Sequence, residues 1–332
     1  MVSIRSATHA GTWYSAHAKE LSQQLLQYLE SSSRECVSKA RIIISPHAGY
    51  RYCGPTMAHA YASLDLKKKP KRIFILGPSH HVYFKNEVLV SHFQELETPL
   101  GNLNVDTAVC ETLVGGSGDG RKLFRYMDKD TDEDEHSLEM QFPMLAQALL
   151  WRQIPLSEVK VVPLMVSHNS VNVDTSVGST LAKYMKDEEN LFIISSDFCH
   201  WGRRFSYTGY VGSTEELENV IAEETEVEML TTRSKLSHHQ VPIWKSIEIM
   251  DKYAMHVLSR NAKSPENLYG EWKQYLEISG NTICGEKPIS VIACALASVG
   301  YKDFEWPAYS QSSNVNSINE SSVSYAAGYG CL

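Results

Sequence analysis

The sequence predicts an α/β protein with a central, mostly buried sheet flanked by helices. Four short apolar segments are rich in Ile and Val and lack alternation, so each is expected to be a strand buried on both faces. Amphipathic helical patterns separate these strands. Each segment also stops at a loop that carries histidine. The four segments lie at residues 42–44, 73–76, 161–166 and 191–194.

The other elements follow in order along the 332 residues. Residues 17–30 place leucines on one face and predict the first helix. Residues 55–64 predict the second helix, with Pro55 suited to its first turn. Residues 88–105 are less regular and could supply a hairpin or edge strands. Further helices are expected at residues 105–113, 137–151, 175–186, 215–231, 242–258, 265–276 and 288–299, and a final strand at residues 322–328.

We expect one domain over residues 1–332, because no repeat of fixed period and no clear linker divides the chain. Residues 115–120 are rich in glycine, but they do not sit between a strand and a helix as a dinucleotide-binding loop must. A flexible loop is expected there. The Ser- and Asn-rich residues 310–322 are either a long loop or a pair of surface strands.

Composition argues against several classes of protein. The formal net charge of -8 does not favour a general binder of nucleic acid or of membrane surfaces. Seven cysteines without dense spacing fit the reduced thiols of the cytosol or nucleus better than a disulfide framework. No apolar stretch has the length of a membrane span, and residues 1–8 lack the apolar core of a signal peptide. We therefore expect a cytoplasmic protein without membrane insertion.

One basic block, residues 67–72, reads Lys-Lys-Lys-Pro-Lys-Arg. As a connection into the next strand it is expected to be a solvated loop. Its composition also fits a nuclear import signal, which would add the nucleus to the expected location.

Two histidines stand in matching places after neighbouring strands. His47 follows the strand at residues 42–44, and His80 follows the strand at residues 73–76. In open α/β sheets ligands bind outside the carboxyl ends of the strands, so these imidazoles are expected to converge on one cleft. Neutral imidazole is a common metal ligand, and the pair predicts the start of a metal site. His81 is expected to be more distant or exposed, because adjacent loop residues rarely both face one ion.

Cys284 lies in a short apolar segment before a helix that Pro288 could open. A cysteine near a helix N-terminus tends to have a lowered pKa, which favours the thiolate as nucleophile or metal ligand. The alternative is an inert buried thiol.

Asp197, Cys199 and His200 form the densest cluster of chemically active side chains. Asp197 could orient an imidazole and so select its tautomer. His200 could donate or accept a proton. The alternative is a helix-capping aspartate beside a structural histidine.

His136 follows acidic residues that most simply complement a helix N-terminus. His136 and Glu139 would share one helix face, which by itself is a weak metal signal. Trp13, near His9, could form the wall of a pocket or belong to the core.

Seven longer motifs connect these residues. They lie at residues 9–14, 46–50, 72–81, 131–137, 195–202, 281–285 and 321–328. Together, over nearly the whole chain, they resemble the Memo family. That resemblance implies a fold similar to class III extradiol dioxygenases, in which two histidines and a carboxylate hold Fe(II).

The resemblance also implies roles for individual residues. His47, His80 and Cys284 match the metal-ligand positions, with cysteine in place of the carboxylate. His136 and His200 match further active-site histidines. The implied cofactor is an iron or copper ion, and zinc is compatible because a thiolate is a soft ligand. Ring-cleaving activity does not follow from the fold alone, because function belongs to the site.

The resemblance finally implies partners and a cellular role. A phosphotyrosine-type peptide or a signalling protein would bind in the metal pocket, lined by Trp13, His81 and Cys199. The implied role is redox-linked signalling to the cytoskeleton, in cell motility or invasive growth. The oligomeric state is left open.

Four functions are therefore weighed, in this order. The first is a metal-binding redox or signalling protein. The second is an active non-haem metal oxidoreductase or dioxygenase on a small molecule, with His200 as acid or base. The third is a metal-free hydrolase with Cys284 as nucleophile and Asp197 as orienting group. The fourth is a phosphopeptide-binding module without catalysis.

Overall fold

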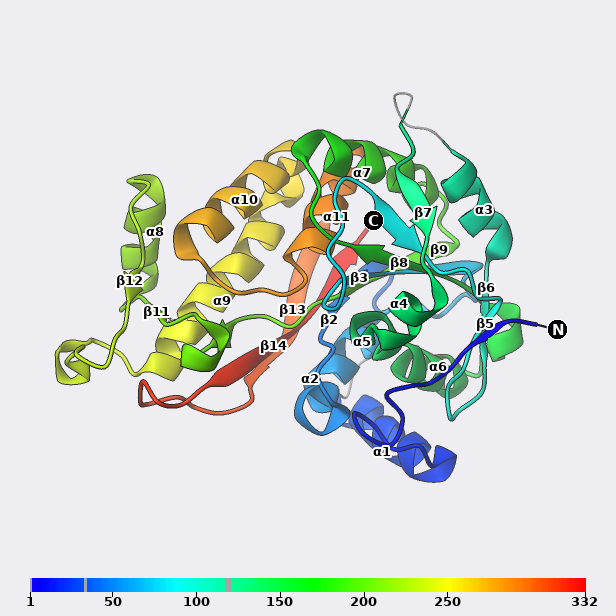
Figure 1. Cartoon of the computed structure of the whole chain (residues 1–332), viewed down its shortest axis with the longest axis horizontal. Coiled ribbons are helices and arrows are strands. Elements are labelled where there is room, and N and C mark those ends of the chain that lie inside the picture. Colours follow the sequence, from blue (N-terminus) through cyan, green and yellow to red (C-terminus); the bar gives the residue numbers. More distant parts are fainter. Residues whose placement is uncertain (1, 33–34, 117–120) are drawn as a thin grey trace.

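A computed structural model describes residues 2–32, 35–116 and 121–332. A large sheet runs through its centre, with helices on both sides (Figure 1). This confirms the predicted α/β class. The strands of the sheet are β1 (Ile4–Arg5), β2 (Ala40–Ser45), β3 (Arg72–Pro78), β4 (Val88–Val90), β5 (Glu95–Leu96), β6 (Leu103–Val105), β7 (Phe124–Tyr126), β8 (Lys160–Val166), β9 (Asn190–Ser195), β10 (His200–Trp201), β13 (Asp303–Gln311) and β14 (Ser322–Cys331).

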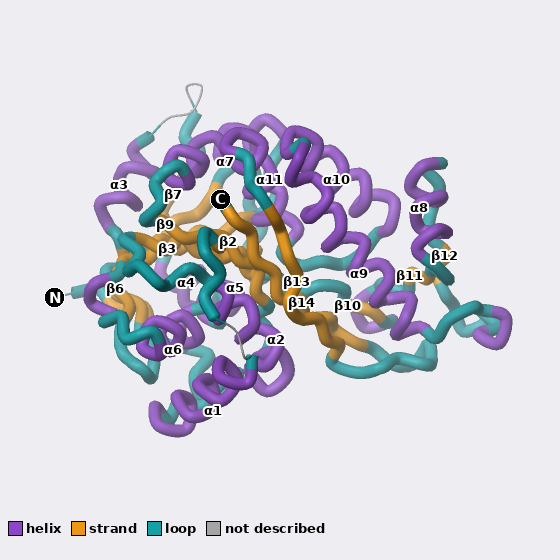
Figure 2. Tube along the Cα trace, turned by 180° about the vertical axis from the view of Figure 1, so that it is seen from behind, coloured by secondary structure: helices purple, strands orange, loops and turns teal. Residues whose placement is uncertain are grey.

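The sheet has the strand order β1-β5-β6-β8-β3-β9-β2-β14-β10, with β13 beside β14 and with β4 joining β7 to β8. The four predicted apolar strands are β2, β3, β8 and β9. They lie next to one another and run parallel. Figure 2 shows β2, β3 and β9 in the middle of the molecule, between layers of helix. Their carboxyl ends therefore share one edge of the sheet, and their amino ends share the opposite edge.

Helices cover the sheet in two layers. On one side, α11 packs against β3, β8 and β9, and α7 packs against α11. On the other side, α2 packs against β2 and β14, and α1 and α6 pack against α2 (Figure 1). The helices are α1 (Ala18–Ser31), α2 (Tyr50–Ser63), α3 (Thr107–Gly115), α4 (Lys129–Asp134), α5 (His136–Glu139), α6 (Phe142–Trp151), α7 (Val171–Met185), α8 (Thr214–Ala222), α9 (Ile243–Arg260), α10 (Leu268–Ser279) and α11 (Glu286–Val299). No described helix is long and apolar enough to cross a membrane.

Helix α2 begins at Tyr50, earlier than predicted, so that Pro55 lies inside the helix rather than in its first turn. A proline at this place removes one backbone hydrogen bond. The early start brings Tyr50 into the core, where its hydroxyl donates to the carbonyl oxygen of Met140 at 2.6 Å. Tertiary packing therefore overrides the local proline signal.

Two predicted helices differ in extent. The helix expected at residues 137–151 is divided into α5 and α6, and Pro143 opens the second piece. The helix expected at residues 215–231 ends at Ala222, because the chain turns at Glu224, which has a φ of 52°. The chain then forms β12 (Glu228–Met229), which pairs with β11 (Gly209–Tyr210) from before α8. This small pair lies with α8 at one end of the molecule (Figure 1).

The structure describes the Ser- and Asn-rich segment and the start of the glycine-rich segment. Strands β13 and β14 pair antiparallel on either side of the Ser- and Asn-rich segment, so that segment connects two strands of the main sheet. In the glycine-rich segment, Gly115 ends α3, and residues 117–120 lie outside the described residues.

Helices α7 and α11 approach closely at Gly178. A Cβ added there would lie 2.6 Å from the Cβ of Cys294 and 2.8 Å from the backbone nitrogen of Ala295. Both atoms belong to α11, whose backbone cannot give way as the end of a flexible side chain can.

Gly178→Ala should therefore lower the free energy of unfolding by about 1–3 kcal/mol through overpacking. Gly270→Ala on α10 is the matched control, because nothing lies within 4 Å of its added Cβ. That variant should gain about 0.5–1 kcal/mol from helix propensity. Urea unfolding followed by circular dichroism measures both values. Equal stability of the two variants would contradict the packing of α7 on α11.

Candidate metal centre

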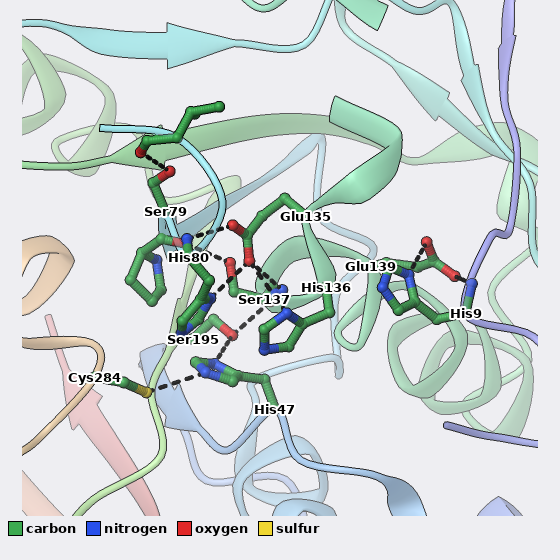
Figure 3. Close-up of polar contacts among 12 residues, drawn as sticks. His9, His47, Ser79, His80, Glu135, His136, Ser137, Glu139, Ser195 and Cys284 are labelled. Atoms are coloured by element: carbon green, nitrogen blue, oxygen red, sulfur yellow. Dashed lines mark hydrogen bonds and ion pairs between the residues drawn. The ribbon is translucent and has the colours of Figure 1, made fainter. Parts of the chain in front are cut away.

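Three histidines meet at the carboxyl edge of the central strands. The loop after β2 carries His47, the loop after β3 carries His80, and His136 opens α5. One ring nitrogen from each lies within 4.8 Å of the others. The ring centroids of His80 and His136 are 4.3 Å apart, and the centroid of His47 lies 5.2 Å from that of His80 (Figure 3). The predicted convergence of His47 and His80 is therefore present in the fold.

The ring of His47 is oriented by Ser195, the last residue of β9. The distance from His47 Nδ1 to Ser195 Oγ is 2.8 Å. That hydroxyl donates its own proton to the carbonyl oxygen of Ser137 at 2.6 Å and accepts from the side-chain amide of Gln141 at 2.8 Å. Its remaining role is to accept from Nδ1–H of His47. The tautomer of His47 therefore presents the lone pair of Nε2 to the cluster and to Cys284.

The ring of His80 is oriented by Glu135. Its Nδ1 lies 2.8 Å from one oxygen of the Glu135 carboxylate, and its backbone N–H donates to the other oxygen at 2.6 Å. Burial alone would raise the pKa of this carboxyl group, but the hydrogen bond and charge of His80 lower it to about 2. Glu135 is therefore a carboxylate that keeps the proton of His80 on Nδ1. Carboxylate–imidazole pairs of this kind orient metal-binding histidines.

His136 completes the cluster through stacking. Its ring lies between the ring of His80 and that of Trp13, whose centroid is 4.5 Å away. Burial and the neighbouring His80 lower the pKa of His136 to about 3. Burial also lowers the pKa of His47. Both side chains are thus neutral imidazoles near pH 7, which is the form that binds metals.

The segment that carries Trp13 is anchored by Glu139. Its buried carboxylate forms an ion pair with Arg5 at 2.6 Å and accepts from the hydroxyl of Tyr14 at 2.7 Å. It also lies 2.8 Å from Nδ1 of His9. These contacts hold the N-terminal segment against α5, as Figure 3 shows for His9 and Glu139. Trp13 of the same segment therefore lies beside His136.

Cys284 lies at the edge of the cluster, in the loop before α11. Its Sγ is 3.1 Å from Nε2 of His47 and accepts from the backbone N–H of Asp197 at 3.2 Å. Burial and then the charge of Asp197 raise the pKa of this thiol well above its ordinary value. The lowered pKa expected from the sequence is therefore wrong, because desolvation outweighs the nearby helix N-terminus. A bound metal ion would replace the thiol proton.

Asp197 supports the backbone of the site. Its carboxylate accepts from the backbone N–H of His47 at 2.8 Å and so joins the loops after β2 and β9. The orientation of the His47 ring comes from Ser195 instead.

A cavity of about 370 Å³ opens beside the cluster. His80, His200 and Cys284 all line it. Nδ1 of His200 lies 2.9 Å from the carbonyl oxygen of Phe198, so this nitrogen donates a proton and Nε2 offers a lone pair that has no partner among the described residues. A small molecule in the cavity would therefore lie next to both the candidate metal ligands and a proton acceptor.

The three predicted pocket residues differ in position. Trp13 is 36% exposed and stacks on His136 at the rim. His81 is exposed, with its ring centroid 6.1 Å from that of His136. Cys199 is fully buried and is not among the described residues that line the cavity.

The residues that orient the ligands were not identified from the sequence. Glu135 carried a signal only for helix capping, and it does accept from the backbone N–H of Ser137 at 2.9 Å. Its second role, the orientation of the His80 ring, depends on the position of the loop after β3. Ser195 and Gln141 carried no signal, because a hydroxyl and an amide are common in every kind of site.

Four side chains offer a donor set that fits a transition metal. His47 and His80 present nitrogens whose tautomers are set by the protein, His136 presents a neutral ring, and Cys284 adds sulfur. Nitrogen and sulfur ligands together suit zinc, copper or iron rather than a hard cation.

Behind the site, the fully buried Asp251 of α9 joins the two loops that carry His200 and Cys284. Its carboxyl group accepts from the backbone N–H of Cys199 at 3.3 Å, from the side-chain amide of Asn281 at 3.0 Å and from the hydroxyl of Tyr309 at 2.8 Å. Burial raises the pKa of Asp251 to about 6.

Because the folded protein holds the Asp251 proton more tightly than the unfolded chain, this stabilisation is complete below about pH 4 and is lost as the pH rises through about 6. Between about pH 4 and pH 7 the wild type should lose roughly 2–3 kcal/mol relative to Asp251→Asn. Urea unfolding of both proteins across this range measures the difference, in which the other titrating groups cancel. A difference that does not change with pH would contradict the assignment.

Comparison with known proteins identifies the family. The family model described as "Memo-like protein" matches residues 5–329. The chain is 66% identical to the MEMO1 family protein MHO1 of Saccharomyces cerevisiae, over 99% of each chain. It is 37% identical to Protein MEMO1 of Mus musculus, over 98% of this chain and 97% of the mouse protein. A solved structure of an uncharacterized protein from Escherichia coli K12 aligns with a TM-score of 0.39 and 13% identity, covering 77% of this chain and 86% of the other. The chain belongs to the Memo family.

Proposed function

We propose that this Memo-family chain binds a redox-active transition metal, iron or copper, at His47, His80, His136 and Cys284. The observation that carries the proposal is the orientation of the first two rings. Each has its outer nitrogen occupied by a protein partner, so the lone pairs of the inner nitrogens point to where the three histidines meet. That of His47 accepts from the thiol of Cys284, which a bound metal ion would deprotonate. Zinc would fit the same donors.

The proposed metal would supply redox or Lewis-acid chemistry at this edge of the sheet. Two imidazoles with a thiolate form a softer donor set than two imidazoles with a carboxylate. The protein contributes ligands whose positions are set before binding. His136 enters the proposed ligand set because its ring nitrogen lies with those of His47 and His80.

A second candidate function is an oxidoreductase, or a dioxygenase in the wider sense, acting on a small molecule. Its support is the cavity that His200 shares with Cys284 and His80. His200 would accept a proton at Nε2, and the adjacent ligands would hold the metal. The resemblance to class III extradiol dioxygenases is the reason to propose an enzyme of this kind.

The metal-free hydrolase has less support. Asp197 contacts the backbone of His47 rather than its ring, so it does not serve as the orienting member of a triad. The raised pKa of Cys284 also keeps that thiol protonated. A nucleophilic cysteine needs the opposite environment.

Peptide binding remains part of the proposal. The half-exposed Trp13 and the exposed His81 form a rim at which a phosphotyrosine-type peptide or a signalling protein would dock. In this proposal the chain acts in the cytoplasm, in redox-linked signalling to the cytoskeleton and cell motility. Access to the nucleus would depend on the basic residues 67–72.

Metal content after purification without chelator or histidine tag tests the proposal. Wild-type protein purified in this way should contain close to one equivalent of iron or copper, as measured by mass spectrometry. His47→Ala, His80→Ala, His136→Ala and Cys284→Ala should each lose most of it, because each removes one donor. His256→Ala, at an exposed position of α9, is the matched control and should retain it. Full metal content in the three histidine variants would overturn the site.

The orienting residues give a finer prediction. Glu135→Gln and Ser195→Ala leave all four proposed ligands in place. The first removes the negative charge and one of the two acceptor oxygens beside His80, and the second removes the hydroxyl that accepts from His47. Metal affinity should fall about 10–100-fold in each variant. A competition titration with a coloured chelator measures the affinity. Wild-type affinity in both variants would mean that the ring orientation does not depend on these contacts.

A further inference from the structure

A second cavity lies at the opposite edge of the sheet from the histidine cluster. Its volume is about 380 Å³, and it is formed by the loops that precede β2, β3 and β9. Strand β2 connects the two edges, with Arg41 near its start and His47 just beyond its end. His47 follows Arg41 by six positions of extended chain, which corresponds to a distance of roughly 20 Å. The two sites are therefore independent.

Arg41 lines this cavity and is only 8% exposed. Its Nη1 donates to the backbone carbonyl oxygens of Met185 at 2.9 Å and Asp187 at 3.0 Å. Within the described residues, its Nε and Nη2 have no hydrogen-bond partner, and no carboxylate forms an ion pair with the guanidinium. Burying a cation without a counter-ion is costly. The N–H groups on Nε and Nη2 of Arg41 are thus available to a ligand in the cavity.

Lysines surround the same cavity. Lys67, Lys68 and Lys69 line it in an exposed loop, and Lys39 lines it from the loop before β2. Lys69 pairs with Glu158 at 2.6 Å. No ion pair of Lys67 or Lys68 occurs in the part of the chain that the structure describes.

Acidic side chains only partly balance these charges. Asp65, Glu188 and Glu189 also line the cavity. One oxygen of Asp65 is occupied by the backbone N–H of Lys39 at 2.7 Å. Because Lys69 is paired with Glu158, four cationic side chains face these three carboxylates, which leaves an excess of one positive charge.

We propose that this cavity binds a small molecule with two or more linked phosphate groups. The free donors of Arg41 match two phosphate oxygens, because guanidinium binds phosphate in a planar, two-pronged geometry. The flexible lysines would neutralise the outer phosphate groups. The volume is that of a small-ligand pocket, and a chain of two or three phosphates is of suitable size for it.

This proposal gives the basic block a role that differs from nuclear import. Pro70 is buried, and the side chain of Arg72 forms an ion pair with Asp106 at 2.6 Å as β3 begins. Only the lysines at the start of the block remain on the rim of the cavity. The block is therefore folded into the protein at one end and faces the proposed ligand at the other.

Isothermal titration calorimetry of the purified full chain with inorganic pyrophosphate and with ATP tests the proposal. We expect saturable binding of at least one of the two. Lys67→Ala combined with Lys68→Ala should weaken it about tenfold or more, because charge-assisted hydrogen bonds are lost. Lys19→Ala combined with Lys263→Ala removes two exposed lysines elsewhere and should leave the affinity unchanged. Metal content should be the same in all variants.

Arg41→Lys keeps the charge but removes the planar fork, and it should weaken binding by a similar factor. If this buried change prevents folding, as judged by circular dichroism, the lysine pair alone decides the outcome. Equal affinity for ATP and pyrophosphate would support a polyphosphate ligand without a base, and tighter binding of ATP would support a nucleotide. No saturable binding of either probe, or equal weakening in the control pair, would overturn the proposal.

Discussion

The parallel pairing of β2, β3, β8 and β9 is the constraint on which the rest of the structure depends. Parallel strands place all their carboxyl ends at one edge, so loops distant in sequence meet there. The loops after β2 and β3 supply His47 and His80, and the end of β9 supplies Ser195. Hydrogen bonds between these loops, such as that from the backbone of His47 to Asp197, then hold the edge together. The direction of the strands therefore determines where the site lies, and the individual side chains determine its chemistry.

The histidines are held by two different kinds of partner. A neutral hydroxyl orients His47, and an ionised carboxylate orients His80. A carboxylate partner makes an imidazole a stronger electron donor to a metal ion than a hydroxyl partner does, so the two rings would bind a metal ion with different strength. The surrounding environment is dry enough to raise the pKa of Cys284 and lower that of His47. Such an environment favours neutral side chains until a cation enters.

The two edges of the sheet have opposite chemistry. The carboxyl edge gathers neutral imidazoles and a thiol, which suit a metal cation. The amino edge gathers Arg41 and lysines, which suit an anion. Both edges lie beyond the ends of the same strands. The middle of each strand carries apolar side chains that pack against helices, so neither site could form there. Polar groups with free donors or lone pairs are left to the loops.

The sequence by itself determined the central strands, the α/β class and the placing of His47 and His80 after successive apolar strands. The expectation that these two strands are neighbours was wrong, because β9 lies between β2 and β3 in the sheet. These features depend on runs of apolar residues and on the direction of the chain, which are local properties. Only the tertiary structure decided that His136 joins the other two histidines, that Glu135 orients His80 across 55 residues, and that Ser195 orients His47 across 148. It also reversed the expected pKa shift of Cys284. Hydrogen-bond partners and desolvation depend on which distant segments pack together, and no local pattern records that.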